Sequence, residues 1–147
     1  MMPKNPWNSY RQVATQTAPP GHLVLMLYDG ALRFLHRSLV GFTLDDPAES
    51  IETINNNILR AQAILHELDM CLNLDGGGDL AMHLRRLYQY FDRRLMESNL
   101  EKTPAGIQEV IQRLGTLREA WACMLSGQPS DAPAMPSLAS IRQLVPA

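Results

Sequence analysis

The apolar positions between residues 23 and 39 recur with the period of a helix and cover an unusually wide part of its surface. At 100° per residue, the apolar side chains of this segment span an arc of roughly 200°, and the polar side chains occupy a narrower strip. A helix that packs on one side needs an apolar stripe of only about 100°. We therefore expect this helix either to be central in its bundle or to pack against two surfaces at once.

A second helix is predicted from residue 47 onward. Asp46 can cap its N-terminus, Pro47 suits the first helical position, and Glu49 stands where an acidic residue completes a capping arrangement. The apolar positions that follow alternate between spacings of three and four, which is typical of the seam of a bundle helix. They are Ile51, Ile54, Ile58, Ala61, Leu65, Leu68 and Leu72.

Two further helical stripes follow. The third helix begins at Asp79, after three consecutive glycines that stop the second. Thr103 and Pro104 form a cap-and-proline start for the fourth helix, and Gly127 ends it. The stripes comprise Leu80, Leu84, Leu87, Tyr88, Phe91 and Leu95 in the third helix, and Ile107, Val110, Ile111, Leu114, Leu117, Trp121, Met124 and Leu125 in the fourth.

These elements predict an all-α fold, an antiparallel four-helix bundle, because no strand-type alternation occurs and the connections are short. Residues 1–19 are polar and contain three prolines, and we interpret them as an N-terminal arm with a short helix. Residues 128–147 are rich in proline and predict a disordered, flexible C-terminal tail, although residues 138–145 are weakly amphipathic and could dock. The bundle spans residues 20–127, with helices at about 20–42, 47–73, 79–99 and 104–126.

Composition narrows the classes of function. The net charge of −2 gives the chain no electrostatic reason to bind nucleic acid. The longest apolar run, residues 23–28, is far too short to span a bilayer, and the N-terminus has no signal-peptide pattern. Cys71 and Cys123 show no metal or redox spacing and fall in helical patterns, which predicts small core residues in a reducing cytosol. We expect a soluble, cytosolic protein without direct membrane insertion.

The sequence contains no arrangement suited to catalysis. A di-metal bundle needs inward-facing Glu and His, but the inner stripes hold no acidic residue. His22, His36, His66 and His83 have no ligand spacing, and the glycines at 76–78 are not followed by the Lys and Ser or Thr of a phosphate loop. We therefore predict that the protein is not an enzyme and that it binds no metal or cofactor.

Several apolar side chains lie outside the predicted core stripes, and they are the most informative about function. Leu59, Ala63, Met70 and Leu74 lie away from the seam of the second helix, and Met82 lies outside the stripe of the third. Such side chains favour an exposed groove that accepts an apolar peptide helix, and methionine adapts well to that role. The alternatives are that a tail covers these residues, or that the bundle is fully packed around the first helix.

A basic strip also stands out on the outer face of the third helix. It consists of Arg85, Arg86, Arg93 and Arg94, with Tyr90 as the one aromatic candidate for stacking. A solvated helix face is the ordinary explanation, and a docking face for an acidic partner is the alternative. Nucleic acid binding is not expected, because stacking aromatics are few.

Five sequence blocks resemble the FliS-type family of flagellar secretion chaperones. Together they cover about residues 10–124, in order and without large gaps. Pro19 departs from the small hydroxyl residue usual at that position, and the tail beyond Gly127 has no counterpart. The blocks are residues 9–13 with 17–31, residues 55–68, residues 74–80, residues 87–95 with Asn99, and Val110, Leu114 and residues 117–121.

The resemblance implies a four-helix bundle in the bacterial cytosol, without catalytic activity or cofactor. It implies a type III flagellar export chaperone that binds the C-terminal helical segment of flagellin, prevents premature polymerisation and aids delivery to the export gate, a membrane protein. The family's N-terminal arm can fold over the apolar surface, and Tyr10 matches the tyrosine of that arm. We assign partner binding to Trp7, Tyr10, Leu59, Ala63, Met70, Leu74, Met82 and Tyr90.

One function from a different class stays open on the residues alone. A structural or adaptor bundle could self-associate through the same apolar surface without a secreted client. The two functions differ in what the surface binds, because an adaptor of this kind would form a dimer that takes up no flagellin peptide.

Overall fold

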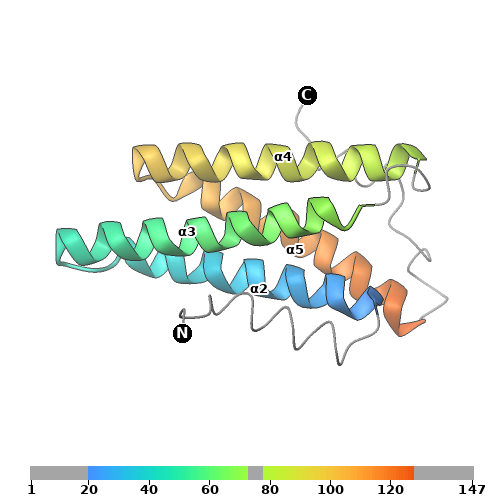
Figure 1. Ribbon diagram of the computed structural model, residues 1–147. Helices are drawn as coiled ribbons and strands as arrows, with labels where there is room; N and C mark the ends of the chain where they lie inside the picture. Colours follow the sequence, from blue (N-terminus) through green and yellow to red (C-terminus); the bar gives the residue numbers. More distant parts are fainter. Residues whose placement is uncertain (1–19, 73–77, 128–147) are drawn as a thin grey trace, which may run out of the picture.

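The computed structural model describes residues 20–72 and 78–127, which form four α-helices and no strands. The all-α prediction is therefore confirmed. The largest difference from the expected bounds is at the second helix, which ends at Met70 instead of near residue 73. The predicted arm and tail lie outside the described residues. The helices are α2 (Pro20–Gly41), α3 (Pro47–Met70), α4 (Gly78–Glu101) and α5 (Ala105–Ser126) (Figure 1).

The two predicted helix caps have different outcomes. Asp46 does cap α3, because its carboxylate accepts a hydrogen bond from the backbone N–H of Glu49 at 3.0 Å. The predicted Thr103 cap of α5 is wrong, since Pro104 occupies the N-cap position and no side chain caps the helix. The backbone N–H of Thr103 instead donates to the carbonyl of Ser98 at 3.1 Å, so Thr103 closes the end of α4.

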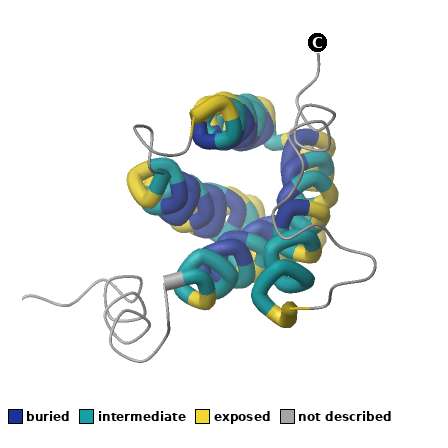
Figure 2. The backbone as a smooth tube through the Cα atoms, turned by 90° about the vertical axis from the view of Figure 1, so that its right-hand side faces the viewer, coloured by how far each residue is buried: buried dark blue, intermediate teal, exposed yellow. Residues whose placement is uncertain are grey.

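Each helix packs chiefly against two neighbours. α2 contacts α3 and α5, and α4 contacts the same two helices (Figures 1 and 2). Glycines let α2 approach α3 closely, because a Cβ atom on Gly41 would lie only 2.6 Å from Ile54 Cγ1. The wide apolar arc of α2 is thus shared between two neighbouring helices, which confirms that it packs against two surfaces.

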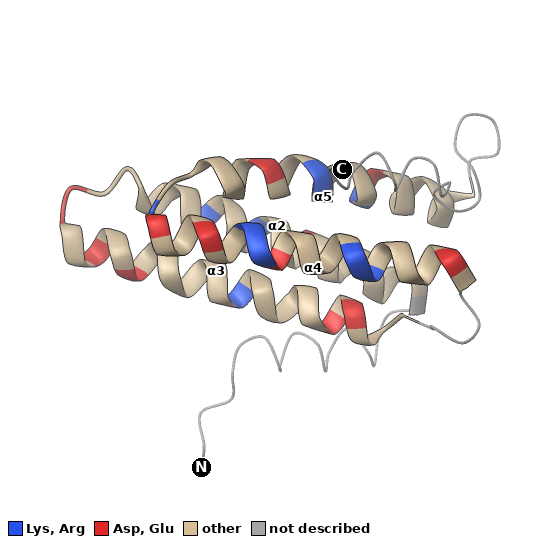
Figure 3. Ribbon diagram, turned by 90° about the horizontal axis from the view of Figure 1, so that it is seen from above, with Lys and Arg blue, Asp and Glu red and all other residues tan. Residues whose placement is uncertain are grey.

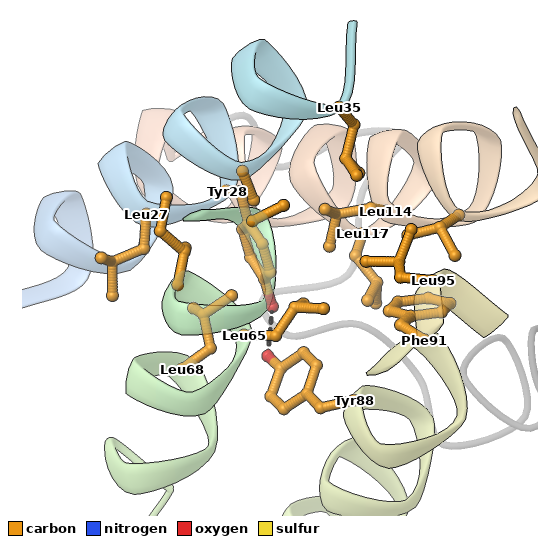
Figure 4. Packing of buried hydrophobic residues seen from close by; sticks show 14 of the residues in the cluster. Leu27, Tyr28, Leu35, Leu65, Leu68, Tyr88, Phe91, Leu95, Leu114 and Leu117 are labelled. Atoms are coloured by element: carbon orange, nitrogen blue, oxygen red, sulfur yellow. Dashed lines mark hydrogen bonds between the residues drawn. The ribbon is translucent and has the colours of Figure 1, made fainter. Parts of the chain in front are cut away.

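The core draws on the predicted stripe of every helix, but not on every stripe residue. Ile51 is exposed, and six others are only partly buried: Leu72, Leu80, Ile111, Trp121, Met124 and Leu125. Ile51, expected at the start of the α3 seam, exposes 53 % of its surface. A strict seven-residue repeat drifts by about 20° per heptad on a straight helix, so the first member of a long seam turns away from the core. The buried residues include Leu27, Leu35, Leu65, Leu68, Phe91, Leu95, Leu114 and Leu117 (Figure 4). Leu87 is buried as well.

The expectation that both cysteines are core residues also needs correction. Cys71 is exposed and Cys123 is only partly buried. Cys71 follows the last residue of α3, and Cys123 lies in the last turn of α5. Both positions fall at helix ends, where fewer neighbouring helices surround a side chain than in the middle of the bundle.

Two buried tyrosines connect α2 and α4 across the diagonal of the bundle. The hydroxyl groups of Tyr28 and Tyr88 lie 2.7 Å apart (Figure 4). Each hydroxyl satisfies the other in an apolar environment, where an unpaired hydroxyl would be costly. Burial raises the pKa of Tyr28 to about 12 and raises the pKa of Tyr88 well above its usual value. Both groups are therefore neutral at physiological pH, and their role is structural.

Candidate functional site

The outer face of α3 carries the exposed apolar stripe that the sequence predicts. Leu59 exposes 52 % of its surface and Met70 exposes 76 %, while Ala63 between them is partly buried. All three lie on the helix face opposite the seam, together with exposed His66. Their side chains are not needed to hold the described bundle together.

A second exposed apolar row runs along the outer face of α4. Met82, Met96 and Leu100 are all exposed, and Leu100 is the most exposed large apolar residue among those described, at 80 %. Met82 was expected from the sequence. Leu100 was missed because it follows the last residue of the inner stripe, although its helical spacing from Met82 and Met96 already places the three on one face.

Hydrogen bonds between the two helices set these rows side by side. Asn99 Nδ2 donates to Asn55 Oδ1 at 2.9 Å, and Gln62 Nε2 donates to the carbonyl of Asp92 at 3.3 Å. This antiparallel register brings three exposed apolar pairs approximately level across the two helices. We call them the α3–α4 face: Ile51 with Leu100, Leu59 with Met96, and Met70 with Met82.

The strip between the two apolar rows is polar and slightly hollowed. Arg85 Nε lies 3.3 Å from Asp69 Oδ1, and His66 Nε2 lies 4.0 Å from Asp92 Oδ1. A pocket of about 150 Å³ opens between these pairs. The α3–α4 face therefore offers apolar contacts along both edges and hydrogen-bonding groups along its middle. The pocket is lined by Leu65, His66, Asp69, Tyr88, Gln89 and Asp92.

Tyr90, also expected to bind a partner, faces α5 instead of the α3–α4 face. Its hydroxyl donates to the carboxylate of Glu109, which also accepts from Arg94 Nε at 2.8 Å and from Arg113 Nε at 3.0 Å. Partial burial alone would raise the pKa of Glu109, but the hydrogen bonds from Tyr90 and Arg94 hold it below its usual value. This cluster ties α4 to α5, so Tyr90 has a structural role that the sequence did not reveal.

The basic strip on α4 is broken up by ion pairs. Arg85 pairs with Asp69 and Arg94 pairs with Glu97 and Glu109. Acidic and basic residues alternate along α4, as Figure 3 shows. The strip thus presents no continuous positive surface, which favours a solvated face over a docking site for an acidic partner.

Three of the expected partner-binding residues cannot be placed on this surface. Trp7, Tyr10 and Leu74 lie outside the described residues.

Within residues 20–72 and 78–127, no group of three or more His, Cys, Asp or Glu side chains is arranged to hold a metal ion. None of the helices in these ranges is both long enough and apolar enough to cross a membrane.

Comparison with known proteins places these features in a family. Residues 3–128 match the family model described as flagellar protein FliS. The chain is 32 % identical to the flagellar secretion chaperone FliS of Bacillus subtilis over 128 residues, which cover 87 % of this chain and 92 % of that protein. It is 33 % identical to the FliS chaperone of Salmonella typhimurium, covering 77 % and 84 % of the two chains. The FliS chaperone of Campylobacter jejuni is 34 % identical, covering 78 % and 87 %.

Proposed function

The chain belongs to the FliS family of flagellar secretion chaperones, and we propose that its α3–α4 face binds the C-terminal segment of flagellin. The protein works in the cytosol, where it keeps this segment from polymerising before export. Its activity is binding, without catalysis or a cofactor. We choose this surface because three exposed apolar pairs are aligned there across two antiparallel helices.

The geometry suits a helical client. An amphipathic helix recognised in a groove presents anchors at spacings of three, four and seven residues, and these can contact both rows of the α3–α4 face at once. The rows contain three methionines, Met70, Met82 and Met96, whose flexible thioether chains repack around different partner side chains. Polar side chains of the client find hydrogen-bonding partners along the middle strip, at His66 and Gln89 among others.

The free energy of binding a client that becomes ordered on the chaperone allows release as well as capture. A flagellin terminus outside the filament is a sticky chain without a packing partner. Ordering it on the chaperone costs about 2–5 kcal/mol of the gross interaction energy, so a large interface still dissociates. The chaperone therefore shields apolar surface during transport and gives it up when export begins.

Two further roles follow from family membership as parts of the same proposal. The loaded chaperone delivers its client to the membrane protein of the flagellar export gate. The N-terminal arm, with Trp7 and Tyr10, covers part of the client surface when the chaperone is empty. Both can be examined with purified components, by capturing the export-gate cytosolic domain with loaded and empty chaperone, and by deleting residues 1–15.

The direct test is complex formation with a flagellin C-terminal segment. Co-expressed with the full chain, the segment should elute as a 1:1 complex in size-exclusion chromatography with light scattering. Leu59 exposes 52 % and Met70 exposes 76 % of its surface, so replacing both by Asp should remove about 2–4 kcal/mol of apolar contact. The affinity should fall at least roughly 30-fold. Val40→Asp is the matched control, because Val40 on α2 is exposed to a similar extent, at 54 %, but lies off the α3–α4 face.

Two results of this experiment would argue against the proposed surface or the proposed function. Unchanged binding by the doubly substituted chain, with helicity intact, would show that the client binds elsewhere on the protein. A dimer that forms without the segment and takes up none of it would favour the self-associating adaptor bundle.

A further inference from the structure

One end of the bundle is incompletely covered by the described residues. α2 begins there, α3 ends, α4 begins and α5 ends (Figure 1). Figure 2 looks onto this end, and the helix turns nearest the viewer are intermediate or exposed. Apolar side chains from α2, α4 and α5, and from the chain just after α3, pack against the core here but are only partly buried: Val24, Leu80, Trp121 and Leu72.

The opposite end of the bundle is better covered beside the connection from α4 to α5, although Ile51 and Leu100 are exposed there. There Leu95 and Ile107 are fully buried beside the short connection from α4 to α5. At the open end, by contrast, no residue of α5 beyond Leu117 is buried, although the sequence stays apolar. The apolar side chains at this end therefore leave surface that a further segment of the chain can bury. The partly buried residues of this last part of α5 are Arg118, Ala120, Trp121, Ala122, Cys123, Met124 and Leu125.

Trp121 lies at this end of the bundle, and two contacts hold its side chain in place. Its Nε1 donates to the carbonyl of Gly21 at 3.0 Å, and its ring meets Tyr28 edge-on with 6.3 Å between centroids. Its indole is therefore fixed between α5 and α2 and still partly exposed. A segment that docks here would bury the remaining indole surface.

We propose that residues 138–145 of this chain cover the open end of the bundle. The chain leaves α5 at Gly127, directly at that end, in the left-handed conformation with φ of 67° that turns it away from the helix axis. The ten residues from 128 to 137 can span up to about 35 Å when extended. Neighbouring helices lie only about 8–10 Å apart, so every helix at this end is within reach.

The sequence of this segment fits the surface. Leu138, Ile141, Leu144 and Val145 fall on one face of a helix, and Ser137 precedes them where a capping residue is favoured. The prolines between residues 128 and 136 prevent continuation of α5, so the segment must pack as a separate element. A helix this short is not stable alone in water, and docking onto apolar surface supplies the missing stabilisation.

This role is separate from the client binding proposed above. The family model matches residues 3–128, so the segment lies beyond the part shared with the family. The N-terminal arm also joins the bundle at this end, at Pro20, but its sequence has little apolar periodicity. The arm and a second copy of the chain are the competing occupants that an experiment must distinguish.

Fluorescence of Trp121 reports directly on occupancy. Trp7 is the other tryptophan in the chain, so Trp7→Phe leaves Trp121 as the single reporter. In the Trp7→Phe chain, removing residues 137–147 should shift the emission of Trp121 to longer wavelength and raise its acrylamide quenching constant. The melting temperature should fall, while the helical circular dichroism of the bundle is retained. Ile141→Asp with Leu144→Asp should act in the same direction, whereas Ser140→Asp with Gln143→Asp on the polar face should change neither property.

Three results would overturn the proposal. The first is Trp121 emission and quenching that are the same in the full and the shortened chain. The second is exposure of Trp121 on deletion of residues 1–15 but not of the tail, which would make the arm the occupant. The third is protection of Trp121 that disappears on dilution, which would assign the surface to a second copy of the chain.

Discussion

Removing one hydroxyl of the Tyr28–Tyr88 pair should destabilise the bundle more than removing both. In either single Tyr→Phe variant, one hydroxyl stays buried without the partner that now lies 2.7 Å away. Both tyrosines expose 3 % of their surface or less, so the desolvation cost of about 1–3 kcal/mol is not recovered from bulk water. The double variant leaves no orphan group, and its cost should be about 1 kcal/mol or less.

The surroundings of the pair make the two single variants unequal. Tyr88 lines the pocket between α3 and α4, and a water molecule there could satisfy its hydroxyl once Tyr28 is Phe. Tyr28 does not line that pocket and exposes only 1 % of its surface. Tyr88→Phe should therefore cost more than Tyr28→Phe, with both between about 1 and 3 kcal/mol.

Urea unfolding followed by circular dichroism at 222 nm measures these differences. All four chains should show the same slope m, so that the shifts in midpoint report stability alone. From these costs, the double-mutant cycle should give a coupling energy of at least about 1 kcal/mol. Costs of the single variants that simply add in the double variant would mean that the hydroxyls do not interact, and would refute the structural role assigned to the pair.

Three further predictions concern stability. Because the folded pKa of Tyr28 is raised to about 12, the unfolded chain loses its tyrosine protons at lower pH than the folded chain. The free energy of unfolding should therefore fall between about pH 10 and 12, and it should fall less in the Tyr28→Phe, Tyr88→Phe chain. Alkaline titration followed by circular dichroism checks this. Gly106→Ala should cost about 1–3 kcal/mol in urea unfolding, because its Cβ would lie 2.3 Å from Ser98 Oγ and 2.8 Å from the carbonyl of Arg94. Gly115→Ala is the matched control, because no atom lies within 4 Å of its added Cβ, and it should be neutral or stabilise the bundle by up to about 1 kcal/mol. Equal effects at the two positions would contradict the packing described for Gly106. Glu109→Gln should cost about 1 kcal/mol in free energy of unfolding at pH 7. Because the folded pKa of Glu109 is depressed, this difference should shrink as the pH falls below the pKa of an ordinary carboxylate and through the lowered folded pKa. A constant difference from pH 7 to pH 3 would argue against the ion-pair cluster.

The α3–α4 face, which we propose as the client surface, combines side chains of which only some carry a signal in the sequence. Leu59 and Met70 stand out because they break the seam of a long, regular helix. Ile51 belongs to the same exposed row, but its spacing makes it look like a core residue. Its exposure depends on how α3 drifts relative to its neighbours over several heptads, and spacing alone does not contain that information.

The sequence by itself determined the helices and the class of the bundle. Both follow from local physics, because apolar periodicity, capping at Asp46 and the glycine after α5 act within a few residues of the chain. The family resemblance likewise rests on local blocks of sequence. For these features, no knowledge of distant contacts was required.

Only the tertiary structure decided which surfaces remain free. The pairing of Leu59 with Met96 in the α3–α4 face depends on the register between two helices, which the bonds from Asn99 to Asn55 and from Gln62 to the Asp92 carbonyl reveal. The structural contact of Tyr90 likewise depends on Glu109, which lies in another helix. Helix register and side-chain partners across helices arise from packing between segments far apart in the chain, and a one-dimensional pattern does not specify them.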